Sequence, residues 1–507
     1  MPLFLRRSGG TPLGVSKNPN RLIIGTSIRQ VKPTNAHKSE RFLGNGRGCH
    51  SQRAKIADLR DGSRHLGCAP HPEQRRAPVM ELDDILVILL AGGAGERLYP
   101  LTRDRAKPAV YFGGPYRIID FTLSNCINSG LRRVFIATQY KSLSLSRHVR
   151  MGWSVVSEEL GEFIEILPPQ KRVGEHWYLG TADAVYQNLY SLERENPRHV
   201  IVLSGDHVYK MDYAKMLRFH VEKDAAATLA TIEIPVEEGS RFGIVAVDEA
   251  DRVVGFEEKP ARPPHVPGSP DVALASMGIY IFKADILMRV LESDATRSDS
   301  QHDFGKNIIP PLFKESSVYS YRFYDENKKA SKYWRDIGTL DAYYEASMDL
   351  CQVNPEFNLY DPEWPLRTYQ PQAPPAKFVF AEEGRRCGQA LDSVISNGCI
   401  ISGSRVSGSI LCPNVRVHSF CEIEDTILMP GVRVGRHARI RRAIIDRDVL
   451  VPRGALIGFN PEEDRRRHTV TDGGVVVVTA EDEPLIATIS ESALQVEFEA
   501  DRVGTLI

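Results

Sequence analysis

Between residues 81 and about 345, short apolar runs of strand length alternate with segments of helical periodicity. The clearest apolar runs lie at 85–90, 134–138 and 200–204. Apolar residues after Thr181 recur at helical spacing, so we expect a helix there with Thr181 as its N-cap. Such alternation predicts an α/β fold, in which helices cover both faces of a mostly parallel sheet. Ligands of these sheets bind beyond the carboxyl ends of the strands.

A different period governs residues 394 to 458. Three series of apolar residues recur every seventeen positions, and the steps between the series run six, five and six. One series is Ile400, Val417, Val434 and Val451; a second is Val406, Ile423, Ile440 and Ile457; a third is Val394, Leu411, Leu428 and Ile445. The spacing predicts a three-sided coil with one inward apolar residue per side, which is a left-handed parallel β-helix of about four coils. An ordinary hairpin sheet would show period two instead.

These patterns divide the chain into an α/β domain at 80–345, a linker at 346–390 and a β-helix domain at 391–480. A proline-rich stretch at 362–375 marks the linker, and a tail follows at 481–507. Residues 1–79 carry 15 basic and 4 acidic side chains without sustained periodicity, and this composition predicts a disordered extension. Met80 immediately precedes the first strand, so we expect the natural start there.

Composition narrows the class of protein. The net charge is −1 and 25% of residues are charged, which favours neither nucleic acid nor a membrane as a partner. The eight cysteines are scattered without a CxxC pair, so the sequence indicates neither a zinc site nor a disulfide framework. We therefore expect a cytoplasmic protein. Neither an HExxH metallohydrolase motif nor a GxSxG nucleophile elbow occurs.

The chemistry centres on the stretch LLAGGAGERLYPLTRDRAKPAV at 89–110. It begins in the first predicted strand, breaks at Gly92 and Gly93, and then turns basic. Glycines allow backbone N–H groups to approach a phosphate closely, because no Cβ intervenes. Arg97 offers a planar pair of donors and Lys107 a point charge. The stretch therefore predicts a nucleoside triphosphate site.

An acidic residue follows the run at 200–204. Asp206 lies in the motif LSGDHVY, at the carboxyl end of the predicted strand. A carboxylate in this place suits Mg²⁺, which prefers oxygen ligands and keeps several waters. An aspartate that only caps a turn would look the same in sequence, so the nucleotide loop upstream is what favours the metal.

The order of strand, glycine turn, Arg-Leu, Pro-Leu-Thr and Lys-Pro resembles the sugar-nucleotide pyrophosphorylases. The continuation RAKPAVYFGGPYRIIDFTLSNCINSG at 105–130 is similar to the bacterial glucose-1-phosphate adenylyltransferases, also called ADP-glucose pyrophosphorylases. The resemblance runs from about residue 81 to 480. It implies a Rossmann-like nucleotidyltransferase domain followed by a left-handed parallel β-helix, and a homotetramer.

The resemblance also assigns roles to residues of this chain. Catalysis falls to Arg97, Lys107 and Asp206, and Mg²⁺ to Asp206 and Asp336. The residues assigned to ATP are Leu90, Ala91, Gly92, Gly93, Gly95, Gln139, Gly180 and Thr181. Those assigned to glucose 1-phosphate are Tyr178, Gly243, Glu258, Lys259 and Ser276. Arg105 and Arg117 match arginines that bind small-molecule allosteric effectors, whose identity the sequence does not reveal.

The implied reaction transfers an adenylyl group from ATP to α-D-glucose 1-phosphate, giving ADP-glucose for glycogen synthesis and pyrophosphate. Two alternatives remain open at this point. The chain could make a UDP-, dTDP- or GDP-sugar, because few side chains read the base. It could also be a regulatory subunit without activity, although such a chain should lose Arg97, Lys107, Asp206 or Lys259, and all four are present.

Overall fold

The computed structural model describes residues 84–93, 95–169, 177–327, 332–382 and 385–485. The predictions made for residues 1–79 and for most of the tail at 481–507 lie outside this part of the chain. Among the described residues, no helix combines the length and the apolar character needed to cross a bilayer.

Four parallel strands form the centre of the first domain. Strand β1 (Ile85–Leu90) pairs with β6 (His199–Ser204) on one side and with β4 (Arg133–Ala137) on the other. Strand β5 (Phe163–Leu167) continues the sheet beyond β4. The three apolar runs of the sequence are therefore confirmed as strands. Their carboxyl ends meet at one edge of the sheet.

The sheet continues beyond β6 with antiparallel strands. The long strand β11 (Val272–Lys283) runs antiparallel to β6 and also pairs with β8 (Ala227–Pro235). Strands β9 (Gly243–Val247) and β10 (Val253–Glu258) form an antiparallel pair next to β11. Strand β12 (Val318–Arg322) lies parallel to β8. The sheet is thus parallel at its centre and mixed on one side.

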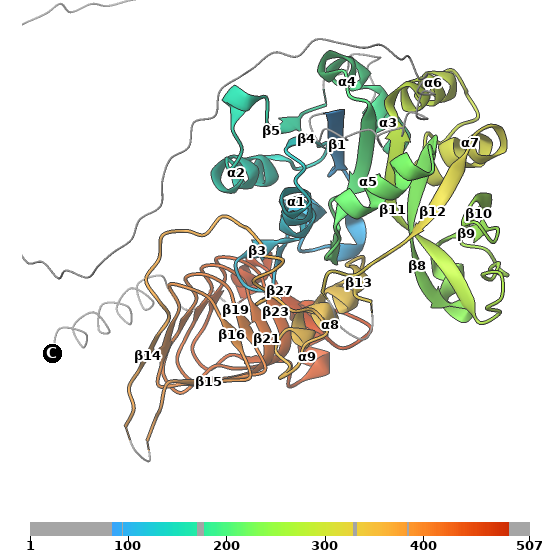
Figure 1. Ribbon diagram of the computed structural model, residues 1–507. Coiled ribbons are helices and arrows are strands. Elements are labelled where there is room, and N and C mark those ends of the chain that lie inside the picture. The colour runs from blue at the N-terminus through green and yellow to red at the C-terminus, as the bar shows by residue number, and fades with distance from the viewer. Residues whose placement is uncertain (1–83, 94, 170–176, 328–331, 383–384, 486–507) are drawn as a thin grey trace, which may run out of the picture. The chain divides into compact units, whose positions relative to one another are not determined.

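Helices cover both faces of the sheet, as the alternation predicts (Figure 1). Along β1, Val87 and Leu89 face one apolar core, whereas Leu86 and Ile88 face the other. The first core is covered by α1 (Ile118–Asn128), α2 (Leu143–Gly152) and α5 (Tyr213–Glu222). The second is covered by α3 (Thr181–Tyr186), α4 (Leu189–Glu195), α6 (Ala284–Ala295) and α7 (Ile309–Glu315).

The C-terminal domain is a parallel β-helix, stacked as short strands in Figure 1. One wall is the sheet β14 (Lys377–Val379), β17 (Ile400–Ser402), β20 (Arg416–Val417), β22 (Arg433–Val434) and β24 (Leu450–Val451). The other walls include β15 (Gln389–Leu391), β16 (Val394–Ile395), β18 (Arg405–Ser407), β19 (Ile410–Leu411), β21 (Glu422–Leu428), β23 (Arg439–Ile445), β25 (Leu456–Ile457) and β27 (Val476–Val478). Strand β14 lies within the stretch predicted as linker, and β15 crosses its end at residue 390.

The seventeen-residue register holds for the later coils and fails in the first. Ile423 pairs with Ile440, and Val417 with Val434, as predicted. In the first coil, however, Ile401 pairs with Val417, so Ile401 is fully buried and Ile400 only half-buried. That coil is one residue shorter than the others. Because strand side chains alternate between faces, a shift by one residue moves the neighbouring side chain inward.

Apolar packing joins the two domains. Helix α8 (Leu340–Asp349) contributes Tyr343 and Tyr344 to a cluster that also contains Ile427 and Ile444 of the β-helix. The Tyr344 hydroxyl donates a hydrogen bond to the backbone carbonyl of Asp425, at 2.7 Å. The interface therefore combines buried apolar area with directed polar contacts.

Candidate active site

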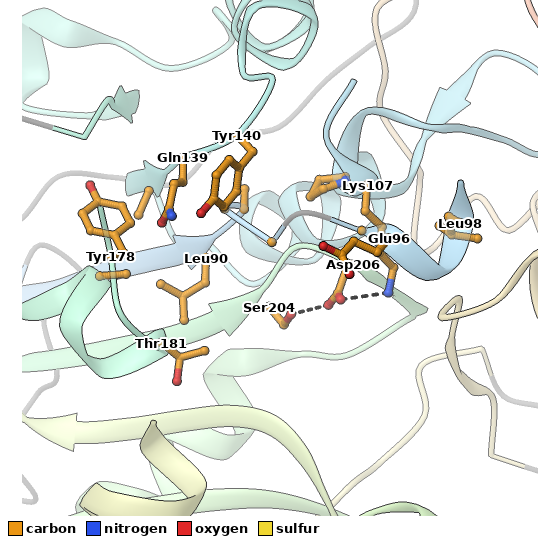
Figure 2. A pocket seen from close by; sticks show the side chains of 18 of the residues that line it. Leu90, Glu96, Leu98, Lys107, Gln139, Tyr140, Tyr178, Thr181, Ser204 and Asp206 are labelled. Atoms are coloured by element: carbon orange, nitrogen blue, oxygen red, sulfur yellow. Dashed lines mark hydrogen bonds and ion pairs between the residues drawn. The ribbon is translucent and has the colours of Figure 1, made fainter. Parts of the chain in front are cut away.

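A pocket of about 720 Å³ opens where the parallel strands end. Figure 2 shows Gln139, Tyr140 and Tyr178 toward one end of this pocket and Lys107 with Asp206 toward the other. All eight residues assigned to ATP from the sequence line it: Leu90, Ala91, Gly92, Gly93, Gly95, Gln139, Gly180 and Thr181. The tertiary structure thus brings these eight residues together from three separate chain segments.

The glycine turn after β1 is shaped by close contacts. A Cβ on Gly92 would lie 3.2 Å from the Cβ of Gln139. Gly95 adopts a φ of 67°, in the left-handed region, and a side chain there would press on Lys107 at 3.1 Å. Only glycine takes this conformation without strain. The turn then enters the short helix η2 (Glu96–Leu98), which carries Arg97 to the pocket.

Lys107 lies between two carboxylates at the floor of this site. Its Nζ donates hydrogen bonds to Asp206 Oδ2 at 2.8 Å and to Asp336 Oδ1 at 3.0 Å. Burial lowers the pKa of Lys107, but the two carboxylates outweigh burial and raise the pKa above its usual value. The ammonium group therefore stays charged at neutral pH.

Asp206 is held in its ionised form. Burial raises the pKa of its carboxyl group, but His207 and Lys107 act in the opposite direction and prevail, so the pKa lies well below the ordinary value. The Ser204 hydroxyl, at the end of β6, also donates a hydrogen bond to Asp206 Oδ1. The carboxylate is thus an acceptor at any physiological pH.

The predicted metal residues fit a divalent cation. Single ligand atoms of Asp206, His207 and Asp336 lie within 4.8 Å of one another, which is the separation that one ion can span. Both carboxylate side chains are about one-third exposed, so the pair is open to solvent at the pocket. Hard oxygen donors of this kind suit Mg²⁺.

The N-cap prediction at Thr181 is wrong. Helix α3 begins at Thr181 itself, and Gly180 is its N-cap. The Thr181 hydroxyl instead donates a hydrogen bond to Asp303 Oδ2, at 3.0 Å. A Cβ on Gly180 would overlap the carbonyl oxygens of Gln301 and His302, so the helix start is pressed against that loop. Glycine takes the cap position because there is no room for a side chain.

Four of the residues assigned to glucose 1-phosphate lie on the antiparallel side of the sheet. Glu258 pairs across β9 and β10 with Gly243, and the register of β11 places Ser276 opposite Gly243 on the other side. The Lys259 amide donates to the carbonyl of Phe242 at 2.9 Å, directly beyond that row. Tyr178 lies apart from them and lines the pocket, where its hydroxyl accepts from the Asn188 side chain at 3.0 Å.

Comparison with known proteins agrees with this geometry. Residues 86–353 match the nucleotidyl transferase family, and residues 374–478 match the GlmU-like C-terminal hexapeptide family. A glucose-1-phosphate adenylyltransferase of Koribacter versatilis is 61% identical over 398 residues, which are 78% of this chain and 95% of the relative. Proteins of the same name from Rhodopirellula baltica and Dechloromonas aromatica are 53% and 52% identical, over 78% of this chain and 89% and 90% of theirs.

The chain belongs to the glucose-1-phosphate adenylyltransferase family.

Membership of this family confirms the predicted fold class. The chain is an α/β nucleotidyltransferase with a C-terminal hexapeptide repeat, that is, a left-handed β-helix. The match to nucleotidyl transferases covers residues 86–353, so it includes the antiparallel strands of the sheet as well as the parallel ones.

The two arginines assigned to effectors lie outside the pocket of this adenylyltransferase. Arg105 is buried and pairs with Asp446 of the β-helix, with Nη2 and Oδ2 2.8 Å apart. Arg117 donates to the carbonyl and hydroxyl oxygens of Ser144 at 3.1 and 2.9 Å, and it lies over the Tyr111 ring. Each guanidinium therefore already has a protein partner.

Several residues of the site escaped the sequence analysis. Ser204, Tyr140 and Gly338 line the pocket, and His207 lies beside both carboxylates. A Cβ on Gly338 would lie 3.0 Å from Asp336 Oδ2 and 3.2 Å from Arg97 Nη2. Ser204 and His207 flank Asp206 within LSGDHVY, so the motif itself held a signal for them.

Proposed function

We propose that this chain transfers the adenylyl group of ATP to α-D-glucose 1-phosphate and releases pyrophosphate. The ADP-glucose so formed would serve glycogen synthesis. One observation carries the proposal: Lys107 joins Asp206 and Asp336 beside the glycine turn, at the carboxyl ends of β1 and β6. Family membership narrows the general chemistry to this reaction.

The residues divide the work of binding. Backbone N–H groups of the glycine turn, together with Arg97 and Lys107, would hold the triphosphate. Gln139 lines the pocket and would contact the nucleoside of ATP, and Tyr178 lines it close by and would contact glucose 1-phosphate. Lys259 would bind the phosphate of the sugar phosphate, and Glu258 the sugar hydroxyls. Arrangement of the two reactants in one geometry lowers the entropic cost of their encounter.

The chemical step needs no covalent intermediate with the protein. A phosphate oxygen of glucose 1-phosphate forms a bond to the α-phosphorus of ATP, and the bond from that phosphorus to the departing pyrophosphate breaks. Arg97 and Lys107 stabilise the negative charge that gathers on the pyrophosphate. Mg²⁺, held by Asp206 and Asp336, would supply further charge neutralisation when bound.

The finer assignments belong to the same proposal. We expect the cation to be Mg²⁺, the assembly to be a homotetramer, the location to be the cytoplasm and the activity to respond to small-molecule effectors. The oxygen donors of the two aspartates support the choice of Mg²⁺.

The purified chain should be tested with glucose 1-phosphate and each of ATP, UTP, dTTP and GTP. We expect ADP-glucose and pyrophosphate to form with ATP at a rate at least tenfold above that with the other nucleotides, a preference of about 1.4 kcal/mol in transition-state binding. A preference for another nucleotide would favour a different sugar-nucleotide pyrophosphorylase. No product with any of the four would favour a regulatory subunit.

A further inference from the structure

A histidine lies beside the two carboxylates without bonding to either. His207 Nε2 is 3.5 Å from Asp206 Oδ1 and 3.8 Å from Asp336 Oδ1. Neither contact is a hydrogen bond, because both distances exceed the roughly 2.7–3.2 Å of an N–H···O hydrogen bond. Among the described residues, these three side chains form the one group of its kind that could hold a metal ion.

The backbone fixes the position of this imidazole. Strand β7 (His207–Tyr209) pairs antiparallel with β13 (Trp334–Asp336), and the register sets His207 directly opposite Asp336. The Trp334 ring packs edge-on against the imidazole, with centroids 5.0 Å apart. The His207 side chain is only 13% exposed. The ring therefore faces the carboxylates because of strand pairing and packing, independently of any hydrogen bond to them.

The nitrogen atoms of this ring have no hydrogen-bond partner in the described part of the chain. Nδ1 is buried and without a hydrogen bond, and Nε2 makes only the two long contacts to the carboxylates. Buried polar groups are nearly always paired in folded proteins. A buried imidazole aimed at two carboxylates, yet bonded to neither, is an arrangement that a further ligand would complete.

We propose that His207 Nε2 is a third protein ligand of the divalent cation, together with Asp206 and Asp336. Adjacent donors around a six-coordinate ion of this size are about 3 Å apart, so the imidazole contacts of 3.5 and 3.8 Å need to shorten by less than about 1 Å. Lys107 now stabilises the carboxylates, and its ammonium group moves aside toward the triphosphate when the ion binds. The inference rests on the proposed function only in its premise that a metal acts at Asp206 and Asp336.

A nitrogen ligand changes which cations the site favours. Imidazole binds Mn²⁺ and Co²⁺ in preference to Mg²⁺, whose usual ligands are oxygens. Loss of His207 should therefore weaken Mn²⁺ binding more than Mg²⁺ binding. A purely structural role for the ring would affect both ions alike.

The decisive measurement is pulsed EPR of Mn²⁺ bound to the full-length chain without substrates. Wild type should show the ¹⁴N modulation of one coordinated imidazole, and His207→Gln should lose it.

Titrations that follow free Mn²⁺ give a second measurement. His207→Gln should raise the Kd of Mn²⁺ about 10- to 100-fold, whereas the Kd of competing Mg²⁺ should change less than about threefold. His199→Gln is the matched control, since His199 also carries a buried Nδ1 without a partner, at the opposite end of β6. We expect this control to match wild type.

Two results would overturn the proposal. One is a wild-type EPR spectrum without ¹⁴N modulation, although Asp336→Asn abolishes Mn²⁺ binding and so shows that the ion occupies this site. The other is an equal loss of Mn²⁺ and Mg²⁺ affinity in His207→Gln. The wild-type spectrum decides the matter even where a variant fails to fold. Because the measurement needs no turnover, absence of adenylyl transfer would count against the proposed function alone.

Discussion

The two halves of the proposed site are built in different ways. The half that we assign to the nucleotide, called the nucleotide half, lies on loops at the ends of parallel strands, where Lys107 bonds both Asp206 and Asp336. The sugar-phosphate half lies on the antiparallel pair β9 and β10, where the Lys259 side chain is 64% exposed. Its ammonium lies 3.8 Å from Glu258 Oε1.

This difference has a physical consequence. Paired charges in a half-buried site have already lost much of their rotamer freedom and hydration, so a nucleotide meets groups that are ordered before it binds. An exposed lysine keeps its rotamer freedom and its hydration, and a bound phosphate must restrict both. We therefore expect substitutions in the nucleotide half to act mainly on turnover, and those in the sugar-phosphate half mainly on substrate affinity.

The largest effect should follow Asp206→Asn. Loss of the negative charge leaves Lys107 with one carboxylate and weakens the hold on the cation, so kcat should fall about 10³-fold, or about 4 kcal/mol. ADP-glucose formation by the purified variant measures this. Asp285→Asn, an exposed residue of α6, is the control and should retain wild-type turnover. A kcat near wild type in Asp206→Asn would contradict the metal assignment.

Lys259→Ala should separate the two halves. We expect KM for glucose 1-phosphate to rise about 10- to 100-fold, while kcat and KM for ATP change less than about threefold, because one charged hydrogen bond to the phosphate is lost. Initial rates at varied concentrations of each substrate give both constants. Lys314→Ala, in α7 and exposed, should behave as wild type. An unchanged KM for glucose 1-phosphate would remove Lys259 from the site.

The pairing in the nucleotide half should be visible in the pH dependence of stability. A carboxyl pKa that is lower in the folded state stabilises the protein above the unfolded pKa of 3.8, and this contribution is lost as pH falls through the folded value. At pH 7 without metal, Asp206→Asn should therefore unfold more easily by about 1–2 kcal/mol, after allowance for partial exposure.

Urea denaturation in EDTA at a series of pH values tests this expectation. The gap between wild type and Asp206→Asn should narrow as the solution is acidified below about pH 4. A gap that stays constant with pH would mean that the Asp206 charge is not stabilised by Lys107 and His207 in the folded protein.

The smallest effect should come from the contact between the halves. The Trp334 ring packs against the rings of His207 and Phe242, with centroids 5.0 and 5.7 Å away. The backbone carbonyl of Phe242 accepts a hydrogen bond from the Lys259 amide. Trp334→Leu removes two aromatic contacts of about 0.5–1.5 kcal/mol each, so both KM values should rise about two- to tenfold. Steady-state kinetics on this variant, with Trp364→Leu in the linker as control, decide whether the halves are coupled. A change confined to one substrate would show that they are independent.

The glycine turn of the nucleotide half could be predicted from the sequence itself, whereas the residues of the sugar-phosphate half were assigned only through resemblance. Glycine turns and apolar runs are local patterns, so Gly92, Gly95 and the strand at 85–90 were readable without a partner. The LSGDHVY motif showed that His207 follows Asp206, but not that it lies beside Asp336, which is 129 positions later and is brought alongside only by the pairing of β7 with β13. The N-cap at Thr181 failed because the nearby loop at Gln301 and His302 excludes a side chain at residue 180.

By itself the sequence determined the alternation of strands and helices, the coiled repeat and the glycine turn after the first strand. Each depends on periodicity or on backbone freedom within a few residues, which a single chain segment carries with it. Tertiary structure decided which charges meet: Lys107 with Asp206 and Asp336, and Arg105 with Asp446. It also decided the register of the first coil, in which Ile401 and not Ile400 points inward. Those outcomes depend on packing between distant segments, and the energy of such contacts exists only once the segments are in place.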